Sequence, residues 1–273
     1  MKYIFLLLFT VNLFAYERII ALSPSINEII YALGEGDKIV GNTKYCNFPE
    51  DAKSKPKVGG YFTPNLEKIV ALKPDIVIML EYTKKLSFKL NKLGIKTKVV
   101  KLTKLQEIKN SISSLGELLG KNKEANKILN DLDTELIDIE NIIQDKKILI
   151  VIHGSASLEK RIFVVGQNLY FDDIINLSGN TNALQTKRKG QPVLNLESVI
   201  ATNPDIVIVL SPRRVERGLS VEDITNPWYS LPITAAKNKN IFVADKPYSS
   251  IASNRLVYFL RDFKEYLTDA KNK

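Results

Sequence analysis

The chain has 273 residues, which is enough for two compact domains. Hydrophobic residues make up 45% of it, so its composition excludes a disordered protein. Lysine and arginine (39) outnumber aspartate and glutamate (30), and a formal charge of +9 fits an anionic ligand, an anionic membrane surface or nucleic acid. Many of the lysines are spaced along predicted helices and turns, which is also typical of a solvated face.

The first residues have the pattern of a secretory signal peptide. Lys2 precedes an apolar run from Tyr3 to Phe14, and Ala15 supplies a small residue at the expected cleavage point. The run is too short to span a bilayer as a helix, and a buried N-terminal strand is the alternative. We expect cleavage after Ala15, export to a bacterial periplasm and, for an exported protein, no nucleic-acid partner.

Short apolar strands alternate with amphipathic helices in the first part of the mature chain. The first predicted helix ends at Leu33, and Ser25 with Glu28 three residues later has the spacing of a capping box at its start. The other predicted elements up to residue 120 are strands at 18–22, 38–40, 76–80 and 98–102, a long irregular segment at 41–64, and helices at 84–93 and 105–119.

A stretch of 16 residues occurs twice, 130 residues apart, as NLEKIVALKPDIVIML at 65–80 and NLESVIATNPDIVIVL at 195–210. Ten positions are identical. Each copy has an Asn cap, a Glu in the first helical turn and a proline that ends the helix. The apolar run that follows is typical of a strand covered on both faces in a parallel sheet. The repeat therefore predicts two copies of one α/β domain.

The segment 121–145 between the two copies contains neither glycine nor proline, and its apolar residues recur at spacings of three and four. This pattern predicts one rigid helix of roughly 36 Å. A coiled-coil arm is the alternative, although the stripe is short for one. The predicted division is a signal peptide at 1–15, an N-terminal lobe at 16–120, the connecting helix at 121–145 and a C-terminal lobe at 146–273.

The second copy is predicted to vary the plan of the first. A short helix is expected to begin at Pro227 and to end at Ala236. The other predicted elements are a strand at 147–152, a hairpin within 154–166, a helix at 168–177, a basic loop at 180–192, a strand at 206–210, an irregular segment at 211–226, a strand at 241–243 and a helix at 253–267.

The predicted fold class is α/β, with two Rossmann-like lobes joined by a single long helix and a ligand cleft between the lobes. A ligand is expected at the carboxyl ends of the strands. The chain has one histidine, His153, and one cysteine, Cys46, without a metal-binding spacing, a nucleophile motif or a phosphate loop. Catalysis, a directly bound metal and a cofactor are therefore not expected, although distant loops could still bring catalytic groups together.

Three stretches together resemble a known family: RIIALSPSINEIIYALG, VGNTKYCNFPEDAKSKPKVGGYFTPNLEKIVALKPDIVI and NLESVIATNPDIVI. They are similar to the helical-backbone substrate-binding proteins of ABC importers, which carry iron–siderophore complexes, haem or cobalamin. The resemblance implies a monomer with a shallow ligand cleft and a membrane permease as partner. It also implies that Glu67 and Glu197 dock onto permease arginines. Each Glu could instead simply complement a helix dipole.

The resemblance leaves the ligand open. Cobalamin binders of this family tend to carry tryptophans along the cleft, whereas this chain has Tyr61 before the first repeat and its only tryptophan, Trp228, elsewhere. Aromatic and basic side chains on cleft-facing loops favour an anionic iron chelate or haem, with cobalamin next. They could also be ordinary loop aromatics and a solvated rim, and an enzyme or sensor on the same scaffold is the alternative function. The candidate ligand-binding residues are Tyr45, Tyr61, Phe62, Lys187, Arg188, Arg213, Arg214 and Lys246.

Overall fold

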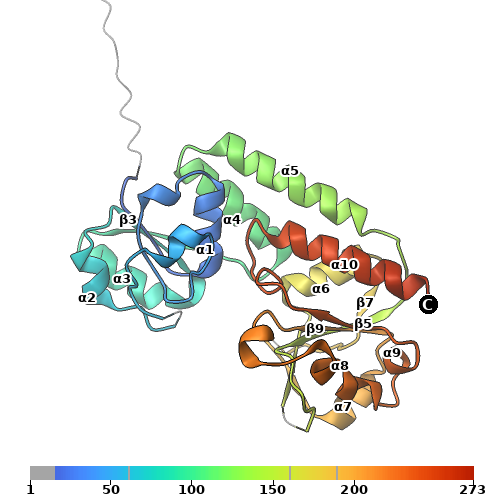
Figure 1. Cartoon of the computed structure of the whole chain (residues 1–273). Coiled ribbons are helices and arrows are strands. Elements are labelled where there is room, and N and C mark those ends of the chain that lie inside the picture. Colours follow the sequence, from blue (N-terminus) through green and yellow to red (C-terminus); the bar gives the residue numbers. More distant parts are fainter. Residues whose placement is uncertain (1–15, 61, 160, 189) are drawn as a thin grey trace, which may run out of the picture.

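The computed structural model describes residues 16–60, 62–159, 161–188 and 190–273, and it has two α/β lobes joined by helices (Figure 1). The predicted signal peptide and Tyr61 lie outside the described residues. No helix in the described part of the chain is long and apolar enough to cross a membrane.

The N-terminal lobe is built on a parallel sheet of four strands in the order β2-β1-β3-β4. Alternate strand residues face opposite sides, as the two-residue period of a strand requires. Ile19 and Ile78 face α1 and α4, whereas Val77 faces α2 and α3. The elements of this lobe are β1 (Ile19–Ala21), α1 (Pro24–Ala32), β2 (Ile39–Asn42), α2 (Leu66–Ala71), β3 (Ile76–Leu80), α3 (Lys84–Lys92) and β4 (Lys96–Val100), with 3-10 turns at Gly36–Lys38, Glu50–Lys53 and Glu81–Thr83.

The C-terminal lobe repeats this plan with a mixed sheet in the order β10-β9-β5-β6-β8, and β7 pairs with β5. Strands β10, β9, β5 and β7 are parallel, while β6 and β8 are antiparallel additions. Its elements are β5 (Lys147–Ile152), β6 (Ile162–Val164), α6 (Tyr170–Leu177), β7 (Thr181–Asn182), β8 (Val193–Leu194), α7 (Leu196–Thr202), β9 (Ile206–Leu210), a 3-10 turn (Val215–Arg217), α8 (Val221–Tyr229), α9 (Thr234–Lys237), β10 (Ile241–Ala244) and α10 (Leu256–Lys271).

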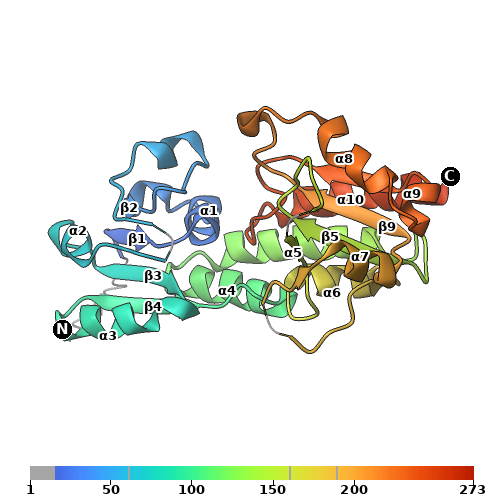
Figure 2. The ribbon, with the colours of Figure 1, turned by 90° about the horizontal axis from the view of Figure 1, so that it is seen from below.

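Two antiparallel helices pass between the lobes (Figure 2). Helix α4 (Leu105–Leu118) begins beside the C-terminal lobe and ends in the N-terminal lobe. Helix α5 (Asn122–Asp138) begins where Lys121 pairs with Glu35 of the N-terminal lobe at 3.0 Å, and it returns to pack against α10. One hydrophobic core runs through both lobes and these helices. The two-lobed α/β prediction is thus confirmed, with α4 as a second helix beside the connecting one.

Three predicted details are wrong. Helix α5 ends at Asp138 rather than 145, because Asn141 and Asp145 have positive φ angles of 58° and 57°. The apolar spacing continues past the end of α5 because Ile139, Ile142 and Ile143 pack on the core from irregular backbone. In this segment the spacing therefore indicates buried residues and not a helix.

The other two errors concern helix starts. Pro227 lies in the last turn of α8, which begins instead at a capping box of Ser220 and Asp223. The first cap is Ser23, whose Oγ accepts from the Ile26 N–H at 3.1 Å, so the predicted pair of Ser25 and Glu28 does not cap α1.

Candidate ligand-binding site

The carboxyl edges of the two sheets face each other across the molecule (Figure 2). Lys104, just beyond β4, donates to the Gln167 carbonyl (2.6 Å) and to Asp173 (3.0 Å) of the C-terminal lobe. Glu28, in the helix after β1, pairs with Arg255, in the segment that follows β10. Loops that leave the strands of either lobe therefore converge on one region, as expected for ligand sites in α/β folds.

The carboxyl edge of the N-terminal sheet carries exposed aromatic side chains, and we refer to it as the aromatic edge. Tyr45 follows β2 and is 47% exposed, and the position of a Cβ at Gly60 would lie 4.0 Å from its ring. Phe62 is 75% exposed and its ring centroid lies 5.2 Å from that of Tyr82, just beyond β3. Two predicted ligand-binding residues thus lie at this edge, together with Phe48, which is 45% exposed and was not among the predicted ones.

A partly buried lysine, Lys57, holds the loop that carries Tyr45 and Phe48. The Lys57 ammonium donates to Asn42 Oδ1 and to the Ala52 carbonyl, each at 2.7 Å. Burial lowers the pKa of Lys57. Gly59 has a φ of +121°, and a Cβ there would meet the Thr63 carbonyl at 2.6 Å, so this turn requires glycine. These contacts tie the loop that carries Tyr45 and Phe48 to the rest of the N-terminal lobe.

The carboxyl edge of the C-terminal sheet is cationic, and we refer to it as the basic edge. It carries His153 after β5, Arg213 and Arg217 after β9, and Lys246 after β10, all exposed. Arg214 has a different position, because its guanidinium binds Asp245 at 2.5 Å and the Leu219 carbonyl at 2.9 Å. Four of these groups remain able to meet a ligand, and Arg214 is already bound within the fold.

His153 has unusual backbone and electrostatic surroundings. Its φ of +66° lies in the left-handed region, which costs a non-glycine residue roughly 1–2 kcal/mol. Partial burial and the charges of Arg213 and Arg217 lower the pKa of the imidazole. Arg217 Nη1 also donates to the Gly154 carbonyl at 2.6 Å, which fixes its guanidinium beside the end of β5. Neither His153 nor Arg217 was among the predicted ligand-binding residues, although each follows a strand end.

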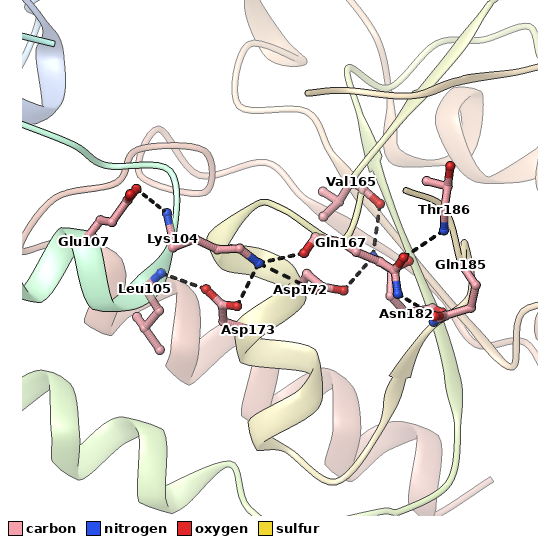
Figure 3. Close-up of polar contacts among 10 residues, drawn as sticks. All are labelled: Lys104, Leu105, Glu107, Val165, Gln167, Asp172, Asp173, Asn182, Gln185 and Thr186. Carbon is pink, nitrogen blue, oxygen red and sulfur yellow. Dashed lines mark hydrogen bonds and ion pairs between the residues drawn. The ribbon is translucent and has the colours of Figure 1, made fainter. Parts of the chain in front are cut away.

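A chain of polar contacts connects the lobe junction to the basic loop of Lys187 and Arg188 (Figure 3). Lys104 binds the backbone carbonyl of Gln167, whose side-chain oxygen accepts from the Thr186 N–H at 2.8 Å. Gly166 lies so close to this loop that a Cβ would meet Pro192 at 3.0 Å. The described part of the loop, with both exposed basic residues, is therefore packed against the segment before α6.

A second junction lies beside Phe48. Glu28 and Arg255 are 4% and 7% exposed, and two hydrogen bonds of 2.5 and 3.1 Å join them. The Ser253 hydroxyl adds a third bond to Glu28 at 2.6 Å. The Arg255 guanidinium also lies over the face of the Phe48 ring, with its Cζ 3.9 Å from the ring centroid. This buried pair ties α1 to the segment after β10, and it explains why Glu28 does not cap its own helix.

The two repeated glutamates lie in the first turns of α2 and α7, as predicted. Asn65 and Asn195 cap these helices through their side chains. Glu67 and Glu197 are both exposed, and Glu197 accepts a hydrogen bond from Asn195 Nδ2 at 2.7 Å. Their exposure leaves the carboxylates able to meet another protein, and the docking role stays a prediction.

The described residues contain no group of three His, Cys, Asp or Glu side chains placed to hold a metal ion. Cys46 is buried beside Thr43, and burial raises the pKa of its thiol. The two edges are suited to holding a large ligand by aromatic contact and charge.

Comparison with known proteins identifies the family. A family model described as periplasmic binding protein matches residues 19–248. The chain belongs to this family. A vitamin B12-binding protein of Vibrio vulnificus is 28% identical over 278 residues, which cover 98% of this periplasmic binding protein and 97% of the relative.

Solved structures share the fold. The periplasmic vitamin B12-binding protein of Vibrio cholerae has a TM-score of 0.80 at 24% identity, covering 94% of this chain and 99% of that one. The periplasmic haem-binding protein of the same species has a TM-score of 0.77 at 21% identity, covering 92% and 98%. At these identities the structural likeness concerns the fold.

Proposed function

We propose that this periplasmic binding protein captures a metal chelate and delivers it to the permease of an ABC importer, without chemistry of its own. The observation that carries the proposal is the opposition of an aromatic edge to a basic edge. Aromatic rings contact the flat or bulky frame of such a ligand, and cationic groups attract its anionic substituents. The relatives named for vitamin B12 and haem support this ligand class.

The charge of the basic edge ranks the ligands. Arg213, Arg217 and Lys246 are exposed, and none of them has an ion pair among the described residues. Lys187 and Arg188 add two exposed cationic side chains on the loop after β7. An iron–siderophore complex or haem, both with anionic oxygens, is therefore favoured over cobalamin. Trp228, a residue of α8, has its side chain buried in the core, so it adds no stacking surface for a corrinoid.

Delivery would use the two repeated glutamates. In each lobe the helix of the repeated motif presents one exposed glutamate in its first turn, and a permease made of two like subunits would offer two matching basic sites. We propose that Glu67 and Glu197 dock there, that the predicted signal peptide directs export to the periplasm, and that the protein acts as a monomer.

One experiment tests capture and delivery together. The Glu67→Ala/Glu197→Ala protein and the wild type are titrated with haem, cobalamin and several ferric siderophores, with ligand absorbance as the readout. Uptake is then measured in proteoliposomes that contain the cognate permease. We expect unchanged affinity for one chelate and loss of uptake, because charges at an interface control encounter and register with the partner.

The control is Glu222→Ala, which removes an exposed carboxylate from the first turn of α8 and should leave uptake normal. Normal uptake by the double variant would refute the docking role. Failure of the wild type to bind any of the chelates would refute the proposed function itself.

A further inference from the structure

Three cationic or protonatable side chains converge at the carboxyl ends of β5 and β9. His153 is the first residue after β5, and Arg213 and Arg217 belong to the turn that follows β9. β5 and β9 are adjacent parallel strands whose last residues, Ile152 and Leu210, are paired in register. The strand pairing therefore brings His153 next to the turn that carries both arginines, the bond from Arg217 to the Gly154 carbonyl holds that side chain beside His153, and all three residues are exposed.

The surrounding contacts leave this cluster with net positive charge. Of the carboxylates near this turn, Asp245 is already paired with Arg214 at 2.5 Å, and Glu216, exposed in the turn itself, offsets one of the two arginine charges at most. Arg217 uses one guanidinium nitrogen to bind the Gly154 carbonyl at 2.6 Å, a neutral partner that orients the group without cancelling its charge. No ion pair to Arg213 or Arg217 occurs among the described residues. An anchored guanidinium with free N–H groups is suited to oxyanions.

We propose that His153, Arg213 and Arg217 form an oxyanion-binding subsite that takes a carboxylate or phosphate group of the ligand. The assignment of that group to a transported chelate rests on the proposed function. The oxyanion would lie between the two guanidinium groups and accept a hydrogen bond from the imidazole. Lys246, after the neighbouring strand β10, would add long-range attraction.

His153 reports on this subsite because it is the only histidine of the chain. Partial burial, and after it the charges of the two arginines, depress the pKa of its imidazole, so a bound oxyanion that offsets those charges should raise that pKa. The protein without any histidine tag is titrated by proton NMR of the imidazole in chloride, phosphate and succinate at equal ionic strength. We expect a saturable rise of the pKa by about 0.5–1 unit in phosphate, in succinate or in both.

Variants locate the response. Arg213→Gln/Arg217→Gln should lose the saturable rise, and the imidazole pKa in chloride should move up toward its ordinary value because the neighbouring charges are gone. Arg217→Lys keeps the charge and should weaken the rise without abolishing it. The control Lys237→Gln removes an exposed charge at the end of α9, which precedes β10 and so lies at the amino end of the strands, away from the subsite. It should behave as the wild type. Circular dichroism verifies that each variant is folded.

The outcomes separate the subsite from transport. A rise in phosphate alone or in succinate alone supports the subsite and names the preferred group. No saturable rise in either anion overturns it, and so does a rise that persists in the double glutamine variant, since binding then occurs elsewhere. Because the probes are simple anions, a positive result supports the subsite even if the protein binds no chelate. If a chelate binds but neither anion shifts the pKa of His153, the subsite is refuted and the proposed function stands.

Discussion

The two lobes share a scaffold and differ at the edge that faces the partner lobe. In each lobe the repeated motif gives a capped helix and a fully buried strand. Its aspartate has the same task twice, because Asp75 accepts from the Arg18 N–H at 2.9 Å and Asp205 from the Lys147 N–H at 2.8 Å, each at the start of the neighbouring strand. The loops beyond the strands carry aromatic rings in one lobe and cations in the other.

This contrast indicates which parts of the duplicated domain are constrained by folding. Burial and strand pairing preserve the motif in both lobes, because a changed residue there would open the core or leave polar groups unpaired. The loops at the carboxyl edges are outside that constraint, and ligand chemistry can differ between them. Three changes test how the two lobes act together, and they are taken in order of expected effect.

The largest effect is expected where the lobes are tied together. Arg255→Met leaves the Glu28 carboxylate, which is 4% exposed in the wild type, with the Ser253 hydroxyl as its one remaining side-chain donor among the described residues. Removal of one partner from a buried pair costs about 3–5 kcal/mol, so the free energy of unfolding should fall by that amount in urea denaturation. The variant also uncovers the Phe48 ring, so it should alter the aromatic edge.

Two comparisons sharpen this test. Glu28→Leu/Arg255→Met removes both charges and should recover much of the lost stability, because no buried charge is left unpaired. Arg261→Gln breaks a pair in which the arginine is exposed, with Glu135 on α5, and should cost no more than about 1 kcal/mol. Equal losses for Arg255→Met and Arg261→Gln would show that the buried pair does not stabilise the junction.

The second effect concerns the relative contributions of the two edges to affinity. Arg213→Gln should weaken binding of an anionic chelate by about 1.5–3 kcal/mol, the range for hydrogen bonds to charged groups. Tyr45→Ala should cost about 0.5–1.5 kcal/mol through lost aromatic contact. Isothermal titration calorimetry with the chelate that binds the wild type measures both.

Tyr229→Ala and Lys237→Gln are the matched controls, since they remove an exposed ring and an exposed charge away from both edges. If Tyr45→Ala costs far more than Arg213→Gln, the ranking of ligands is reversed, and a neutral corrinoid fits better than an anionic chelate.

The scaffold could be predicted from the sequence because its rules are local. Asn65 and Asn195 as helix caps, and the apolar runs as buried strands, follow from residue type and spacing alone. The interlobe contacts could not be predicted in this way. Glu28 has capping-box spacing to Ser25, and only the fold shows that it meets Arg255, 227 residues away.

The candidate site was predictable to the same extent. The two edges could be predicted from where the strands end, so Tyr45 and Arg213 were correctly expected there. The binding of Arg214 to Asp245 could not, because it depends on the pairing of β9 with β10. Nothing in the spacing of Arg213, Arg214 and Arg217 distinguishes the bound arginine from the others.

The smallest effect is the pH dependence that the basic edge gives to stability. The folded pKa of His153 lies below its unfolded value of about 6.5, because burial and the charges of Arg213 and Arg217 disfavour the imidazolium. Between these two values the unfolded chain binds more protons, so stability falls as the pH drops below about 6.5 and is unaffected above it. His153→Gln should remove this part of the pH dependence, measured by urea denaturation from about pH 8 to about pH 5.5.

Carboxylates titrate in both proteins, so the difference between the stability curves of the wild type and His153→Gln isolates the histidine. Arg213→Gln/Arg217→Gln should reduce the difference without abolishing it, because burial still depresses the pKa when the two charges are gone. A difference that grows in the opposite direction, with the wild type gaining stability in acid, would mean that the imidazolium is stabilised in the fold and that the basic edge is not positive at His153.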